Sequence, residues 1–157
     1  MTNPALTERQ QRAITQAAAT KNALLEAQEH LHRALMLPQT GREQAWAERV
    51  ARELEAARQA LEAHKAEVRG PGGLYEEVRF EAPWLIPRVN QLVAQMDRIE
   101  RELADLAIEV QRVQDGDLQG LHAIRHDAER AMAMLRDLLA KEADLVYERF
   151  TEPAALD

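Results

Sequence analysis

The chain has 157 residues, of which 46% are apolar, a size and composition that fit one globular domain and leave no room for two. It contains no cysteine, which excludes disulfides, thiolate metal sites and cysteine nucleophiles. The formal net charge of −7 argues against nucleic-acid binding, since phosphate neutralisation needs concentrated Lys and Arg. No stretch approaches the ~18 consecutive apolar residues of a membrane helix, and the first ten residues, MTNPALTERQ, lack the basic and apolar regions of a secretory signal. We therefore expect a cytoplasmic protein that does not enter membranes.

Glycine and proline divide the chain into four long segments free of helix breakers. Thr7, followed three residues later by Gln10, is typical of a capping box at the first helix, whereas Thr40 is the candidate cap of the second and Asp115 or Asp117 that of the fourth. The sequence predicts one domain over 1–157 with long helices at about 7–36, 41–69, 84–114 and 117–150 and a short helix at 74–80.

Apolar residues recur at helical spacing in each long segment and never alternate as in a strand. The third segment is the clearest, because its apolar residues follow one another at steps of three or four: Leu85, Val89, Leu92, Met96, Ile99, Leu103, Leu106, Val110 and Val113. Four helices of similar length with short connections indicate an all-α, up-down-up-down four-helix bundle.

The connection at residues 70–87 interrupts this regularity. A Gly-Pro-Gly-Gly turn precedes the short helix, and Pro83 and Pro87 suit the first turn of the helix that follows. We expect this segment to fold back and close one end of the bundle with its large apolar residues, namely Leu74, Tyr75, Val78, Phe80 and Trp84.

Three polar residues, Gln28, His64 and Glu142, occupy positions on the apolar faces, and Glu67 follows His64 on the same side of its helix. Unpaired burial of such groups costs about 1–3 kcal/mol each, so they need partners. One interpretation is a metal site between the helices, with His32 able to reach the same layer. The other, which we favour, is a hydrogen-bonded layer such as His64 with Gln28 or Glu142.

No motif of covalent catalysis or cofactor binding is present. The chain lacks a nucleophile elbow, a phosphate-binding loop and a dinucleotide fingerprint. His122 and His126 form an i,i+4 pair, but their charged neighbours favour a solvent-exposed position without a role. We therefore predict no catalytic residue and no organic cofactor.

Two stretches resemble the bacterial hemerythrin-like (HHE) domains. Residues 64–78 read HKAEVRGPGGLYEEV and continue to APWL at 82–85, while residues 143–150 read ADLVYERF. In such domains the second helix ends with a His and a nearby Glu before a Gly-Pro-x-Gly-Leu turn. The resemblance covers residues 20–152 as architecture and implies a four-helix bundle that binds two iron ions between its helices, in some members to carry or sense oxygen.

Carried over position by position, most of the iron ligands that the resemblance implies are missing. The second helix keeps His64 and Glu67, but the other histidine positions correspond to Gln28, Met96 and Leu138. Met96 and Leu138 cannot hold iron as His would. Apolar residues at these positions are what a bundle without its metal would need for packing.

The leading hypothesis is a hemerythrin-like bundle with a vestigial diiron site, acting without enzymatic activity as a binding or regulatory module and carrying no cofactor. Its partner is an unidentified protein or small molecule, and the chain is a monomer or a homodimer. One alternative is an iron-dependent oxygen- or redox-handling protein with His64, Glu67, His32 and Glu142 around one ion. The other is a helical oligomerisation or scaffold protein.

Overall fold

The computed structural model describes residues 6–151, so the predicted domain 1–157 extends beyond the described residues at both ends. In chain order the described part contains α1 (Glu8–Leu35), α2 (Glu43–Arg69), the short α3 (Leu74–Glu81), the 3₁₀ turn η1 (Pro83–Leu85), α4 (Ile86–Gln114), α5 (Leu121–Val146) and the π-helical turn η2 (Tyr147–Thr151).

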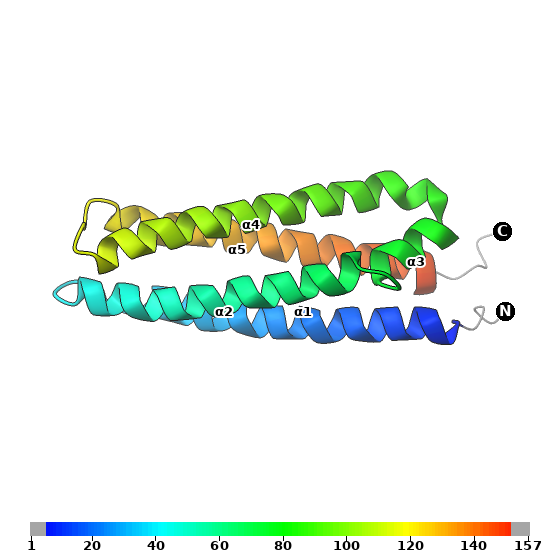
Figure 1. The fold of residues 1–157 in the computed structure, drawn as a ribbon, viewed down its shortest axis with the longest axis horizontal. Coiled ribbons are helices and arrows are strands. Elements are labelled where there is room, and N and C mark those ends of the chain that lie inside the picture. The colour runs from blue at the N-terminus through cyan, green and yellow to red at the C-terminus, as the bar shows by residue number, and fades with distance from the viewer. Residues whose placement is uncertain (1–5, 152–157) are drawn as a thin grey trace.

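The four long helices lie side by side, and each runs opposite to the one before it (Figure 1). Helix α1 packs along α2, α2 along α4, and α4 along α5, which also contacts α1. Helices α2 and α5 therefore occupy diagonal positions across the bundle. Helix α3 lies at the end where the chain enters α1 and leaves α5 (Figure 1). The predicted all-α four-helix bundle is confirmed, and no strand occurs in residues 6–151.

The predicted apolar faces form the core. All nine members of the row in the third long segment, from Leu85 to Val113, are buried. They pack with the apolar rows of the other three long helices in one continuous hydrophobic cluster. Within the described residues, no helix combines the length and the apolar character needed to cross a membrane.

The helix ends agree with the prediction at α1 and depart from it elsewhere. Thr7 and Gln10 form the predicted capping box, with Thr7 Oγ1 accepting from Gln10 N at 3.0 Å. Thr40 does not cap α2, which begins after Arg42 without a side-chain cap. Helix α5 begins at Leu121 and not at 117, since Gly116 adopts a φ of 99° and the Asp117 carboxylate accepts from Gln119 N, a local turn that competes with the helix.

The connection between α2 and α4 closes the end of the bundle as expected, but only some of the apolar residues predicted to take part do so. Leu74, Tyr75 and Val78 are fully or almost fully buried. Phe80 and Trp84, in contrast, are each 73% exposed, so the expectation that they belong to the closing group is wrong. Within a helix as short as α3 only one face can point inward, and Tyr75 and Val78 occupy it.

Candidate functional site: a buried polar layer

A hydrogen-bonded layer of four side chains crosses the interior of the bundle. His64 Nε2 lies 2.8 Å from Glu142 Oε1, and His64 Nδ1 lies 2.7 Å from Thr20 Oγ1. The Tyr75 hydroxyl donates to the second carboxylate oxygen, Glu142 Oε2, in a very short hydrogen bond. His64 and Tyr75 have no exposed surface, and Glu142 is 4% exposed. The layer therefore connects α1, α2, α3 and α5, with His64, Tyr75 and Glu142 buried and Thr20 partly exposed at its edge.

The local sequence explains how each member reaches the layer. His64 and Glu142 occupy apolar-face positions of α2 and α5, so the packing of those faces carries them inward. Thr20 lies one turn before the buried Leu24 on α1. Tyr75 arrives from the end of the bundle, because the turn at 70–73 reverses the chain and points the inner face of α3 at Glu142.

The Thr20 hydroxyl has backbone acceptors within reach as well as His64. It lies 3.2 Å from Ala17 O and 3.3 Å from Gln16 O. When it donates to one of these carbonyls, its oxygen can accept from His64 Nδ1–H; when it donates to His64 Nδ1, the Nε2–H of His64 donates to Glu142 Oε1. Both arrangements keep the contacts of the layer.

Tyr75 is held in its protonated form. Burial raises the pKa of the Tyr75 hydroxyl far above its ordinary value, and the neighbouring negative charge of Glu142 raises it further. A tyrosine in this position acts as a permanent hydrogen-bond donor to the carboxylate. It does not act as a general base or a nucleophile at neutral pH.

Apolar side chains occupy two of the three other histidine positions that the hemerythrin-like resemblance assigned to iron ligands, and the third is Gln28. Met96 on α4 and Leu138 on α5 are fully buried, and both belong to the hydrophobic core cluster. Gln28 on α1 is also buried, but it is eight residues from Thr20, about 12 Å along the helix. The predicted pairing of His64 with Gln28 is therefore wrong, and the predicted pairing of His64 with Glu142 is confirmed.

The structure does not assemble the four-ligand site. His32 is exposed and lies twelve residues beyond Thr20, about 18 Å along α1, so it cannot reach His64. Glu67 is half-buried, one turn beyond His64 on α2. No group of three or more His, Asp or Glu side chains that could hold a metal occurs among the described residues. Both His64 nitrogens are bonded to protein groups, and two of the implied ligand positions hold Met96 and Leu138, so these residues do not fit a diiron centre.

Sequence reasoning missed two members of the layer. Thr20 was not singled out, although it is the one hydroxyl next to the apolar face of α1 at the depth of His64. Tyr75 was expected only as one of the apolar residues that close the end of the bundle. Its hydroxyl could have indicated a place in the layer, because a buried tyrosine needs a hydrogen-bond partner. A polar partner for Tyr75 was therefore required, but its identity was not readable from the sequence.

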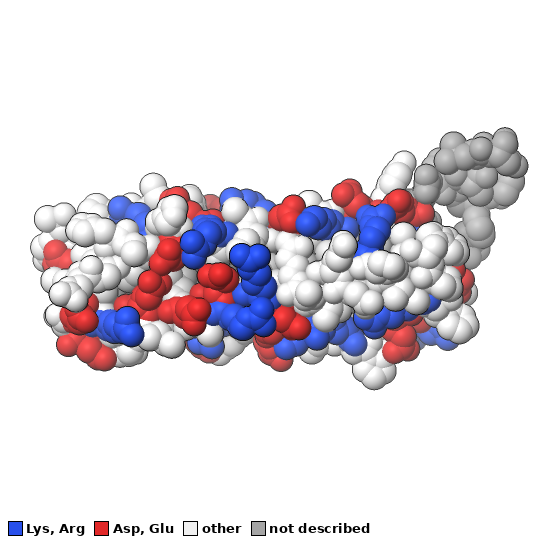
Figure 2. All heavy atoms as spheres, turned by 90° about the horizontal axis from the view of Figure 1, so that it is seen from above, with Lys and Arg blue, Asp and Glu red and all other residues white. Residues whose placement is uncertain are grey.

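Acidic side chains gather on the half of the α4–α5 face that is farther from the termini (Figure 2). They include Glu102, Asp105, Glu109 and Asp127, with Arg112 and Arg130 between them. Burial raises the pKa of Glu109 to about 7, with help from its hydrogen bond to Asp127 and the negative charge of that residue. Glu109 therefore keeps its proton to a higher pH than a free carboxyl group does.

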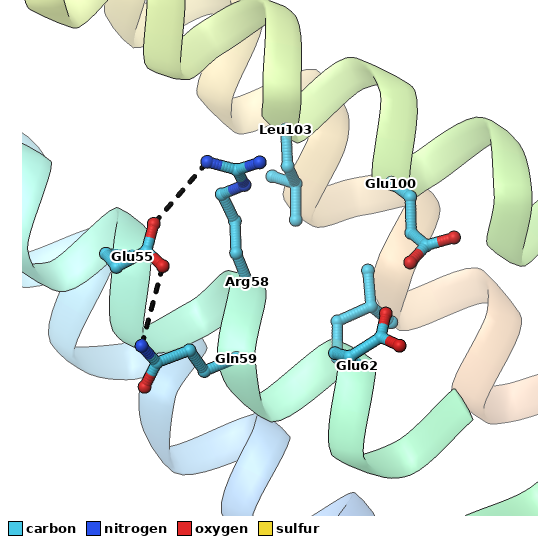
Figure 3. A pocket seen from close by; sticks show the side chains of 7 residues that line it. Glu55, Arg58, Gln59, Glu62, Glu100 and Leu103 are labelled. Carbon is cyan, nitrogen blue, oxygen red and sulfur yellow. Dashed lines mark hydrogen bonds and ion pairs between the residues drawn. The ribbon is translucent and has the colours of Figure 1, made fainter. Parts of the chain in front are cut away.

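A shallow groove of about 280 Å³ lies between α2 and α4. The carboxylates of Glu62 and Glu100 point into it from the two helices (Figure 3), and Lys65 Nζ binds Glu100 at 2.9 Å. Arg58 and Gln59 both contact Glu55 at its margin. These are the contacts of a solvated helical surface, and they contain no nucleophile with an adjacent base.

No family model matches this sequence, and no curated protein or solved structure matches it. The resemblance of residues 64–85 and 143–150 to hemerythrin-like domains therefore stays a prediction.

Proposed function

We propose that the protein is a non-catalytic binding or regulatory module, built as a hemerythrin-like bundle in which side-chain hydrogen bonds replace the metal. The observation that carries this proposal is the layer of Thr20, His64, Glu142 and Tyr75. Its four side chains bond to one another and leave no ligand atom directed at a substrate.

Access and chemistry both support a non-catalytic role. A catalytic group must lie within hydrogen-bond reach of a substrate, but His64, Tyr75 and Glu142 are sealed inside the core. The high pKa of the Tyr75 hydroxyl removes it as a base. Met96 and Leu138, at two of the implied ligand positions, belong to the hydrophobic core and supply packing in place of coordination. The interior of the bundle therefore serves stability and alignment.

The layer gives the bundle a defined register. A buried polar network is favourable only when every member finds its partner, so a sliding of one helix along another is penalised. A shift of one turn would separate His64 from Glu142 and break the hydrogen bond between them inside the core. With a fixed interior, recognition falls to the outer surface, as in a module that presents residues on a rigid scaffold.

Metal analysis of protein purified from iron-supplemented cells tests the proposal. We expect far less than one iron per chain, the same content in His64→Ala as in the wild type, and no absorption from an oxo-bridged iron pair. His126→Ala is the matched control, since His126 is an exposed histidine distant from the layer. Near-stoichiometric iron that disappears in His64→Ala and persists in His126→Ala would contradict the proposal.

A further inference from the structure

A groove of about 650 Å³ lies between α4 and α5, beside the acidic half of the same face. Ala94 and Gln95 line it from α4, and Ala133 and Met134 line it from α5. Ala94 and Ala133 are both exposed. Because their side chains are short, another chain can approach both helix backbones closely here.

Gln95 holds the two walls of the groove together. Its Nε2 atom donates to the backbone oxygen of Met134 at 3.2 Å and to Asp137 Oδ2 at 3.0 Å, so it bridges α4 and α5. Met134 packs against the hydrophobic core with part of its surface and lines the groove with the rest. The walls are thereby preorganised, whereas the methionine side chain can adapt to the shape of what it contacts.

The groove carries a local surplus of positive charge. Arg98 of α4 and Arg130 and Lys141 of α5 line it, and Asp137 is the one carboxylate among the described residues that do. Asp137 already binds Lys141 at 2.9 Å, and within residues 6–151 Arg98 forms no ion pair. The chain as a whole has a net charge of −7, but salt screens distant charges over about 8–10 Å, so this surplus governs groups that enter the groove.

The shape of the groove selects a helix over a small molecule. Only two helices wall it, and its charged residues Arg98, Arg130, Asp137 and Lys141 are all exposed. Small ligands bind in sites that enclose about 70–90% of their surface, which an open groove does not provide. A trough between two neighbouring helices instead offers the seat that an amphipathic helix fills with one face.

The surroundings of the groove exclude larger polyanions. Acidic side chains gather on the neighbouring half of the same face (Figure 2), among them Glu102, Asp105 and Glu109. A nucleic acid or an anionic membrane would extend over this half and be repelled there. A single helix that lies between Arg130 and Lys141 does not need to cross it.

We infer that the groove between α4 and α5 binds an amphipathic helix of another protein, which directs acidic side chains at Arg98, Arg130 and Lys141. Arg130 and Lys141 are eleven residues apart on α5, about 16 Å, which equals three turns of a partner helix. Carboxylates at the two ends of such a three-turn stretch meet these two cations, and apolar residues between them contact Ala133 and Met134. Arg98 reaches the same helix from the opposite wall.

This inference rests on the binding role proposed above, and the two can fail separately. Iron analysis tests the interior of the bundle, whereas binding of a helix tests only its surface. The probe is a fluorescent helical peptide of about 18 residues, built of Ala, Leu and Glu with the Glu residues flanking the Leu face, and its anisotropy reports binding to the full chain. The control peptide has Lys in place of every Glu.

We expect saturable binding of the Glu peptide and none of the Lys peptide. Arg98→Glu should weaken binding at least about tenfold, because it replaces an attraction by a repulsion, and Ala133→Trp should do the same by filling the groove. Arg52→Glu is the matched control, since Arg52 is an exposed arginine of α2 outside the groove, and it should bind as the wild type does. All three positions are exposed, so the thermal midpoints should stay close to that of the wild type.

Three results would overturn the inference. One is the absence of saturable binding of the Glu peptide to the wild type. Another is binding that Arg98→Glu and Ala133→Trp leave intact, or that Arg52→Glu weakens equally. The last is a wild type that forms dimers without peptide and loses them in Arg98→Glu, as sedimentation velocity would show, because the groove would then bind a second copy of this chain.

Discussion

The imidazole of His64 and the carboxylate of Glu142 lie 2.8 Å apart in the bundle interior, although 78 residues separate them along the chain. They belong to α2 and α5, which occupy diagonal positions, so this contact spans the bundle between helices that share little direct packing. Thr20 and Tyr75 complete the layer from the other two directions. The contact thus joins two helices that have little other direct packing between them.

Removing one member of this pair should cost more than removing both. Glu142→Leu leaves the Nε2 atom of buried His64 without its hydrogen-bond partner, and His64→Leu leaves Oε1 of Glu142 without its own. We expect each to lower the free energy of unfolding by about 3–5 kcal/mol, as for other broken buried pairs. The double variant should lose less than either single variant, because both polar groups are gone and apolar side chains fill the space.

Urea unfolding of the four proteins in this double-mutant cycle measures the coupling. Losses that simply add would mean that the two side chains do not stabilise each other across the core. Glu129→Leu is the control, since Glu129 is exposed on α5 and its replacement should change stability little. Ala128→Leu would not serve, because Ala128 is buried.

Tyr75→Phe should have a smaller effect. The substitution removes the hydroxyl that donates to Glu142 Oε2 and keeps the buried ring. A lost hydrogen bond to a charged acceptor lowers stability by about 1.5–3 kcal/mol, so the variant should still fold. Chemical unfolding together with the near-ultraviolet circular dichroism of the aromatic residues measures this. Unchanged stability would show that the hydroxyl does not support the carboxylate.

Gly73→Ala should destabilise the turn between α2 and α3. A Cβ at position 73 would lie 2.2 Å from the backbone oxygen of Glu67, and a backbone atom cannot move aside cheaply. We expect a loss of more than about 2 kcal/mol, since the turn must open and Tyr75 must shift with it. Gly120→Ala is the control: a Cβ there meets no atom within 4 Å, and its φ of −89° suits alanine. Equal thermal midpoints for the two variants would contradict the prediction.

Stability should fall as the pH rises through the titration of Glu109. The folded state raises the pKa of this carboxyl from 4.5 to about 7, through burial and the hydrogen bond to Asp127. The folded protein therefore binds the proton more tightly than the unfolded chain. The resulting stabilisation is complete below about pH 4.5 and is lost as the pH rises to about 7 and beyond.

Glu109→Gln removes this dependence because the amide is neutral at every pH. We expect the variant to be more stable than the wild type at about pH 8 and to lose the advantage at about pH 5, as measured by thermal unfolding. Glu129→Gln serves as the exposed control on the facing helix. If the wild type instead became more stable relative to Glu109→Gln as the pH rose from about 5 to about 8, the predicted sign of the effect would be wrong.

The sequence predicted the helices and the core well because both depend on local periodicity. Every apolar residue of the row from Leu85 to Val113 points inward as its spacing required. The capping box of Thr7 was readable for the same reason, since its hydrogen bonds join residues three apart. Thr40 failed as a cap because Gly41, with a φ of 80°, and Arg42 place the helix start two residues later.

The polar layer was only partly readable, because its composition depends on how far each helix slides along its neighbours. The pairing of His64 with Glu142 was one of two that the pattern allowed, and the register of α1 excluded Gln28 and His32 while it brought in Thr20. The exposure of Trp84 depends on the direction in which η1 leaves α3, which no residue pattern specifies.

The most direct test of the polar layer is a crystal structure of protein from iron-supplemented cells, with anomalous diffraction recorded at the iron absorption edge. We predict direct contacts of His64 with Thr20 and Glu142, with Met96 and Leu138 in the apolar core and no anomalous peak at this depth. One or two strong peaks between His64 and Glu142, with the two side chains separated to bind the ions, would contradict it.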